Sequence, residues 1–249
     1  MTMKETNTYG ILGTILWLLF IGGVYLLIQS LVIGVYAGIN QSPDAGVLTQ
    51  EQIEATMLEL QFNGNVFAWA TIVSGVICTL LVFLAAKLKK TSEIKNYLAL
   101  HATKPSTFLW WGLIFIAFLI LSEILSNLLG VNSVPKEMMS IFQSAFPKWP
   151  LWLAIVLVAP IFEEVFFRGF LYKGLSNSIL GVIGAILITN TMWTLLHVHY
   201  EPFFIGVIFI LGLVFGWARY KTGSILVPIF LHVVNNSLAI VQLYFVTNV

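Results

Sequence analysis

Residues 151–171 read LWLAIVLVAPIFEEVFFRGFL, an apolar segment that contains two adjacent glutamates and one arginine. A helix needs about 20 mostly apolar residues to cross the hydrocarbon core of a bilayer, which is roughly 30 Å thick. An ionisable side chain at that depth costs at least about 2.5 kcal/mol on insertion scales. The segment therefore predicts a transmembrane helix that carries a functional site.

Six further apolar segments have a comparable length. They are Tyr9–Ile39, Val66–Leu88, Phe108–Leu129, Ile179–Val198, Phe203–Tyr220 and Ser224–Val246. Apolar residues make up 59% of the 249 residues and charged residues only 9%, which excludes a water-soluble protein, a coiled coil and a disordered chain. A net charge of +1 without a basic stripe excludes a nucleic-acid partner. We predict an all-α polytopic transmembrane bundle of seven, at most eight, membrane helices in contact with lipid.

The connections after residue 172 are only a few residues long, so neighbouring helices must pack antiparallel there. Residues 146–249 are therefore expected to form the functional helical core, with residues 1–145 as accessory helices and loops. Gly212 and Gly216 form a small-xxx-small pair, which predicts close packing of their helix against a neighbour. The segment from Thr49 to Gln52 resembles a capping box and predicts a short surface helix.

Basic residues gather in the connections at one end of the predicted bundle. These are Lys4, Lys87, Lys89, Lys90, Lys95, Lys104, Lys173, Arg219 and Lys221, whereas Gly38–Asn63 carries Asp44 and three glutamates but no cation. Because cytoplasmic loops are enriched in Lys and Arg, we expect a cytoplasmic N-terminus and an external C-terminus. The expected location is the inner (plasma) membrane of a prokaryote.

The three ionisable residues of segment 151–171 divide into a pair and a single acid. Glu164 and Arg168 lie at i,i+4 spacing, so each can neutralise the other. Glu163 projects about 100° away from Glu164 on a helix. Glu163 is therefore free to face a different cavity.

Two later segments also place polar side chains in apolar surroundings. His197 and His199 project about 200° apart on a helix, and His199 lies beside a predicted chain reversal, so His197 is the better candidate. His232 and Asn236 share one helix face at i,i+4 spacing, with Asn235 as a weaker alternative. An ordinary interhelical hydrogen bond contributes only about 0.6 kcal/mol. Such bonds poorly explain why Glu163, His197 and His232 occur together in one chain.

A carboxylate, two imidazoles and a carboxamide in one membrane cavity suit the activation of water and the stabilisation of an oxyanion. Peptide-bond hydrolysis is the reaction that these groups favour. The chain has no H-E-x-x-H zinc helix and no G-x-S-x-G nucleophile motif. Asp44 is its only aspartate, which excludes an aspartyl dyad.

In chain order, Glu163-Glu164-x-x-x-Arg168, Trp193-x-x-x-His197 and His232-x-x-x-Asn236 resemble the three motifs of the CAAX-protease and bacteriocin-processing (CPBP) family. This family of intramembrane proteases includes the type II CAAX prenyl endopeptidases and the Abi-like proteins. The resemblance covers roughly residues 149–245 and implies an intramembrane endopeptidase acting on a peptide or membrane protein.

The resemblance also implies a role for each motif residue. Glu163 would be the general base, His197 its partner on the water, and His232 with Asn236 the oxyanion donors. The supporting residues would be Glu164, Arg168 and Trp193. The family usually has phenylalanine at the position of Trp193, so the larger ring is expected to narrow the pocket.

Two mechanisms and two other classes of protein stay open at this point. Glu163, His197 and His232 suit a Zn²⁺ site with an open position, but no second carboxylate partner for each histidine is readable, which favours a metal-free mechanism. A non-catalytic bacteriocin-immunity or scaffold protein would use the same motifs for binding. A proton-coupled transporter is disfavoured because the chain has no internal repeat.

The depths of Glu163 and His197 set a geometric condition on the site. With straight helices these residues lie about 15 Å apart along the membrane normal. They meet only if residues 171–184 run partly along the interface, or if the helix breaks near Gly181 or Gly184. We expect a cavity that opens toward the cytoplasm or laterally to lipid.

Overall fold

The computed structural model describes residues 8–40, 49–89, 93–131 and 134–247, and all regular structure in these ranges is helical. Six of the described helices are long and apolar enough to cross a membrane: α1 (Gly10–Asn40), α3 (Gly64–Leu88), α5 (Pro105–Leu129), the continuous helix Trp149–Ser176, α11 (Pro202–Thr222) and α12 (Leu226–Thr247). The seventh predicted segment is the shorter helix α10 (Gly181–Leu195). The all-α polytopic bundle is confirmed; Lys4, Asp44 and Lys90 lie outside the described residues.

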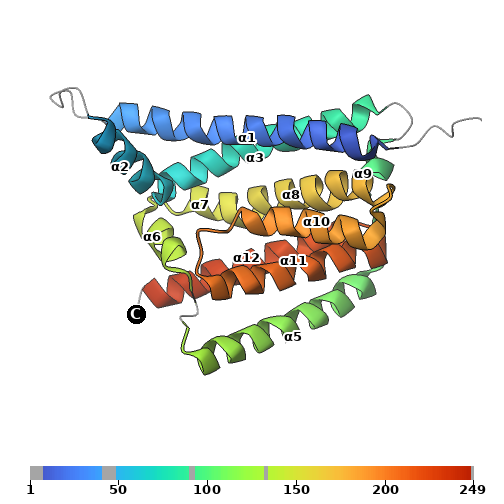
Figure 1. The fold of residues 1–249 in the computed structure, drawn as a ribbon. Coiled ribbons are helices and arrows are strands. Elements are labelled where there is room, and N and C mark those ends of the chain that lie inside the picture. Colours follow the sequence, from blue (N-terminus) through green and yellow to red (C-terminus); the bar gives the residue numbers. More distant parts are fainter. Residues whose placement is uncertain (1–7, 41–48, 90–92, 132–133, 248–249) are drawn as a thin grey trace, which may run out of the picture.

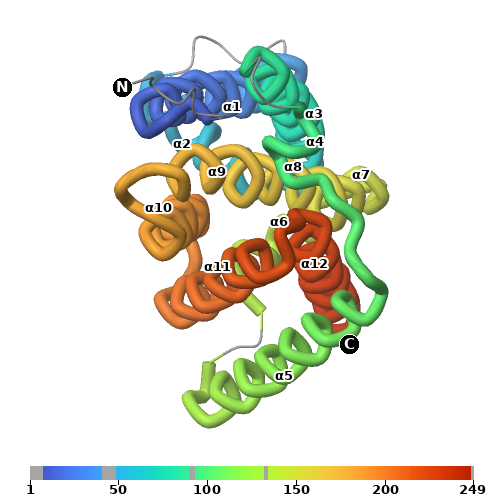
Figure 2. The backbone as a smooth tube through the Cα atoms, turned by 90° about the vertical axis from the view of Figure 1, so that its right-hand side faces the viewer, coloured from blue at the N-terminus to red at the C-terminus, as the bar shows by residue number. Residues whose placement is uncertain are grey.

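The helices are arranged around Trp149–Ser176, which lies in the middle of the bundle (Figures 1 and 2). Helices α1 and α3 pack against each other and cover one side of it. Helices α10, α11 and α12 lie on the other side, and α5 lies outermost, against α11 and α12. The central helix therefore has protein on most of its surface, whereas α5 has protein on one side only.

The central helix contains two π-helical stretches. It consists of α7 (Trp149–Leu153), η1 (Ala154–Val158), α8 (Ala159–Glu163), η2 (Glu164–Leu171) and α9 (Tyr172–Ser176). In η1 the Ala159 N–H bonds to the Ala154 carbonyl, five residues back. The same spacing pairs the Ile155 carbonyl with Pro160, which has no N–H. The Ile155 carbonyl is thus available to another helix.

Three short helices lie in the connections. Helix α2 (Gln50–Gln61) begins with the predicted capping box, in which Thr49 and Gln52 bond to each other's backbone N–H. Helix α4 (Ile94–Tyr97) is a single turn. Helix α6 (Lys136–Ser144) is amphipathic and buries Ile141 and Phe142 in a core cluster. The sequence analysis missed α6, whose alternating apolar residues are too few to stand out among the long spans.

The small residues of α11 allow the predicted close contact with α10. A methyl group on Gly212 would collide with the Asn190 carboxamide and lie 2.7 Å from the Trp193 ring. A methyl group on Gly216 would lie 2.9 Å from Ile186. The close packing therefore holds the Trp193 ring in place on the side that faces Gly212.

The chain turns at residues 177–180 between α9 and α10, and Gly181 begins α10 with a φ of +60°. This left-handed conformation suits glycine, because it has no Cβ. Gly181 is thus the first residue of α10, which runs to Leu195 without a further break. Glu163 and Trp193 lie at nearly equal distances along the chain from this turn, so the two side chains meet without a tilted segment.

Candidate active site

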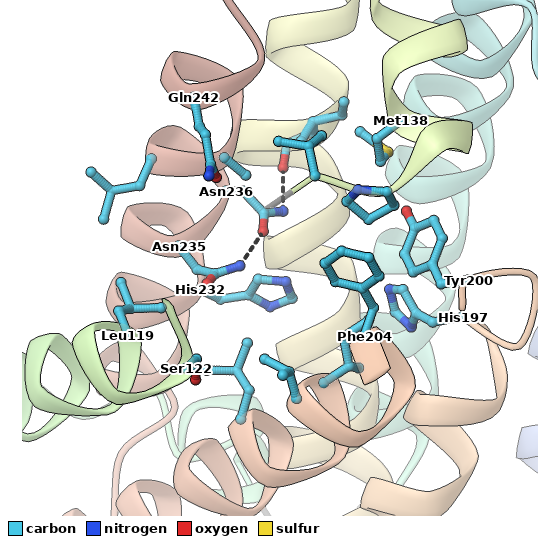
Figure 3. Close-up of a pocket in the computed structure, with 18 of the residues that line it drawn as sticks. Leu119, Ser122, Met138, His197, Tyr200, Phe204, His232, Asn235, Asn236 and Gln242 are labelled. Atoms are coloured by element: carbon cyan, nitrogen blue, oxygen red, sulfur yellow. Dashed lines mark hydrogen bonds between the residues drawn. The ribbon is translucent and has the colours of Figure 1, made fainter. Parts of the chain in front are cut away.

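A cavity of about 520 Å³ lies in the half of the bundle where α5, α10 and α12 end. The five residues at the centre of the sequence prediction all line it, as do side chains of α5, α6 and α11 (Figure 3). These five are Glu163, Trp193, His197, His232 and Asn236. The structure therefore brings the three motifs to one cavity, as the spatial prediction required.

Glu163 lies between a tryptophan and a histidine. Its Oε2 accepts a hydrogen bond from Nε1 of Trp193, which is 2% exposed. The same oxygen lies 3.8 Å from Nε2 of His232. Besides filling the pocket, Trp193 thus supplies an N–H that the phenylalanine usual in the family cannot supply. This donor stabilises the charged form of the carboxylate and holds it in one orientation.

Glu164 and Arg168 form the predicted i,i+4 ion pair, with Oε1 of Glu164 and Nη1 of Arg168 3.1 Å apart. Both side chains are fully buried, and the guanidinium also lies 4.5 Å above the Trp193 ring and donates to the Gly212 carbonyl. Oε1 of Glu164 accepts a second hydrogen bond, from Nδ1 of His232 at 2.9 Å. The buried acid therefore connects the arginine to the histidine of the last helix.

These contacts orient both imidazoles. Nδ1 of His232 donates to the carboxylate of Glu164, which places its Nε2 on the side of Glu163. Nδ1 of His197 donates to the Trp193 carbonyl at 3.1 Å, so Nε2 is the ring nitrogen of His197 left for another partner. The 3.8 Å between His232 and Glu163 is too long for a direct hydrogen bond and suits a shared water.

Asn236 connects α12 to the π-helical stretch η1. Its Nδ2 donates to the free Ile155 carbonyl at 2.7 Å, and its Oδ1 accepts from Asn235 at 3.1 Å. A carboxamide nitrogen has two hydrogens, so one N–H of Asn236 is left for the cavity. Asn236 therefore helps to hold His232 at its depth, in addition to any role as a donor.

The comparisons with known proteins agree with the motif pattern. Residues 145–238 match the family described as Type II CAAX prenyl endopeptidase Rce1-like. This part of the chain is therefore similar to that family. The chain is also 25% identical over 177 residues to the membrane-embedded CAAX protease MroQ of Staphylococcus aureus (strain USA300), which covers 67% of this chain and 69% of the relative. No solved structure matches the chain significantly.

The Rce1-like region does not form the whole cavity. Helix α5 contributes Ser122 and Glu123, and α6 contributes Met138 (Figure 3). Glu123 is thus part of the wall. His199 lies outside the cavity lining and packs against Tyr200, as expected for the less favoured histidine.

Glu163, His197 and His232 have the donor atoms of a zinc site, and Glu164 gives His232 a carboxylate partner that the sequence did not reveal, but the three side chains do not form one cluster. The described residues contain no group of three or more His, Cys, Asp and Glu side chains that could hold a metal ion. Of the three suggested ligands, Glu163 has Oε2 committed to Trp193, and the two histidines approach it from different helices without a common centre. We therefore derive no chemical step through a metal.

Proposed function

We propose that the chain is an intramembrane endopeptidase that hydrolyses a peptide bond with a water activated by Glu163. One observation carries the proposal: a carboxylate and two imidazoles line one cavity inside an apolar bundle. The similarity of residues 145–238 to a protease family supports the same reaction class. The protein is an integral membrane protein with six helices long enough to span the bilayer among its described residues.

The resemblance implied His197 as the partner of Glu163 on the water and His232 as an oxyanion donor. We place the water between Glu163 and His232 instead, because Oε2 and Nε2 of these residues lie 3.8 Å apart. The water donates its two hydrogens to them. Its oxygen attacks the carbonyl carbon of the scissile bond as Glu163 accepts the first proton. The carbonyl electrons move to the oxygen, and the remaining N–H of Asn236 donates to the oxyanion. Glu163 then transfers its proton to the amide nitrogen, the C–N bond breaks, and the amine leaves. Nε2 of His197 accepts the substrate N–H on the opposite side of the cavity.

In this mechanism Glu164, Arg168 and Trp193 are positioning residues. Glu164 orients the imidazole of His232, and Arg168 holds the carboxylate of Glu164 through their ion pair. Trp193 holds Glu163 through its N–H and is itself held by Gly212. None of the three has to touch the substrate.

The charge distribution favours a cavity that opens on the outer face of the membrane. Among the described residues, the cavity end of the bundle carries only Lys136 and Lys148, and Lys136 pairs with Glu201. The opposite end carries Lys87, Lys89, Lys95, Lys104, Lys173, Arg219 and Lys221 (Figure 1). By the positive-inside rule the basic end is cytoplasmic. We therefore propose external access for the substrate, in place of the cytoplasmic access expected from the sequence.

The test compares the peptides released from membranes that contain the wild type or the Glu163→Gln variant. Loss of a general base lowers the rate about 10²- to 10⁴-fold, so the peptides cut by the wild type should disappear. The matched control is Glu59→Gln on the exposed face of α2, which should cut like the wild type. Thermal unfolding in detergent checks that both variants are folded.

Two results would overturn the proposal. Undiminished cleavage by Glu163→Gln would show that Glu163 is not the general base. Absence of any wild-type product, combined with peptide binding that survives in Glu163→Gln and His232→Ala, would indicate the immunity or scaffold alternative. A chelator arm tests the metal-free mechanism: the rate should be unchanged by EDTA, and a loss restored by Zn²⁺ would contradict that mechanism.

A further inference from the structure

Tyr200 is a cavity-lining residue that none of the three motifs includes. It follows α10 in the turn that leads to α11, and its backbone N–H bonds to the His197 carbonyl at 3.0 Å. Its ring centre lies 5.8 Å from that of His197 and 4.3 Å from that of His199. Figure 3 shows the ring beside His197, with the hydroxyl on the Met138 side of the cavity.

The hydroxyl of Tyr200 is one of the side-chain donors in the cavity wall, together with the carboxamides of Asn235, Asn236 and Gln242. The other lining residues with a hydroxyl are Ser122 and Ser126, and both donate to carbonyls of their own segment, at 2.9 and 3.1 Å. One N–H of Asn236 is committed to Ile155. Within the described ranges, Tyr200 is thus the lining hydroxyl that has no hydrogen-bond partner in the protein.

The surroundings of Tyr200 keep it protonated. Burial raises the pKa of its hydroxyl, and the nearby carboxylates of Glu137 and Glu163 raise it further. A neutral phenol on a ring with two packed neighbours is a donor held in place before the reaction, which is what stabilisation of a developing charge requires.

We propose that the Tyr200 hydroxyl donates a hydrogen bond to the oxyanion that forms on the scissile carbonyl. This inference rests on the proposed endopeptidase function and adds a catalytic donor to it. Tyr200 transfers no proton: the hydrogen bond strengthens as the carbonyl electrons move to oxygen, and it weakens when the C–N bond breaks and the carbonyl reforms. With the single remaining N–H of Asn236, it completes a two-donor site.

The experiment measures kcat and KM for Tyr200→Phe on a peptide that the wild type cuts, with Glu163→Gln in parallel. Removal of one oxyanion donor lowers kcat about 10²- to 10³-fold, and KM should change little because the bond is made in the transition state. The control is Tyr220→Phe, at the opposite end of α11, which should behave like the wild type. A kcat for Tyr200→Phe within about twofold of the wild type, or a loss confined to KM, overturns the inference.

A second measurement uses the same peptide with a phosphinate in place of the scissile amide, as a mimic of the tetrahedral intermediate. Tyr200→Phe should bind it about 10²-fold more weakly than the wild type, with Tyr220→Phe unchanged. Equal affinity in both variants contradicts the role of Tyr200 even where turnover is low. An inactive Glu163→Gln beside a fully active Tyr200→Phe refutes this inference alone; an active Glu163→Gln refutes the endopeptidase proposal and this inference with it.

Discussion

The central helix Trp149–Ser176 and helix α5 have similar lengths and similar apolar compositions, yet they have different surroundings. Of their most apolar windows, 56% of residues are buried in the central helix and 6% in α5. The central helix contains Glu163, Glu164 and Arg168, whereas α5 has Glu123 as its one ionisable residue. Hydropathy places both helices in the membrane. The charged residues and the packing together distinguish the helix that organises the site from the helix that closes one side of it.

The difference also shows how charges are stabilised at membrane depth. Three charged groups of the central helix each bond to a different helix: Glu163 to α10, Glu164 to α12 and Arg168 to the backbone of α11. A buried charge that loses its partner has no water to replace it. The central helix should therefore be sensitive to small changes that α5 tolerates.

The largest effect is expected from a substitution that breaks the buried ion pair. Arg168→Met leaves the carboxylate of Glu164 without its countercharge, which costs about 3–5 kcal/mol of unfolding free energy for a buried pair. Reversible unfolding in mixed micelles measures it. The double variant Glu164→Gln/Arg168→Met should lose less than Arg168→Met, because neither charge is then left alone.

The control for this experiment lies at the start of α5. Lys104→Met removes an exposed cation and should change the unfolding free energy by less than about 0.5 kcal/mol. A loss of unfolding free energy of similar size in Arg168→Met and Lys104→Met would mean that burial does not determine how sensitive the two helices are to substitution. Equal losses in the single and double variants would contradict the ion-pair explanation.

A medium effect is expected where α11 contacts α10. Gly212→Ala forces the new methyl group against Asn190 and Trp193, and overpacking of this kind costs about 1–3 kcal/mol. The displacement of Trp193 should also lower the rate of cleavage. Gly206→Ala, on the same helix with no atom within 4 Å of the added methyl, should be neutral or slightly stabilising. Stability and rate that fall equally in both variants would exclude the contact as the cause.

The smallest effect is expected on the outer side of α5. Leu128 is 78% exposed, so Leu128→Ala should change the unfolding free energy by less than about 0.5 kcal/mol. The same unfolding assay measures it, with Leu151→Ala in the central helix as the contrast. Leu151 is fully buried and its truncation should cost about 2–5 kcal/mol. A loss at Leu128 as large as that at Leu151 would indicate that α5 has a protein partner on its outer face.

The sequence predicted the helices and the convergence of the three motifs because both follow from local patterns. Apolar length predicts a span, and an acid or a histidine inside a span requires a partner. The i,i+4 relation of Glu164 and Arg168 follows from helix geometry alone and is confirmed at 3.1 Å. The interruption of the helix before α10 could also be predicted, because Gly181 lies between Glu163 and His197, and straight helices would place these two residues at different depths in the membrane.

The remaining features depend on contacts between distant parts of the chain. The π-helical hydrogen bonding of η1 leaves the Ile155 carbonyl free. Asn236, which lies 81 residues further along the chain, donates to this carbonyl. Pro160 is compatible with the start of an ordinary α-helix as well as with a π-helical stretch. The proline alone therefore did not predict the π-helical stretch. Tyr200 carried no signal, because a tyrosine beside a turn is common at a membrane interface.

The short α10 has a consequence for the water that hydrolysis consumes. Its 15 residues extend about 22 Å, less than the roughly 30 Å of a typical hydrocarbon layer. Lipids adjust to such a mismatch by thinning next to the short helix. Because α10 ends beside His197, the thinned annulus borders the cavity, and the polar headgroup region comes closer to Glu163 than its depth along the central helix suggests. The length of one helix thus shortens the route by which water reaches a carboxylate inside the membrane.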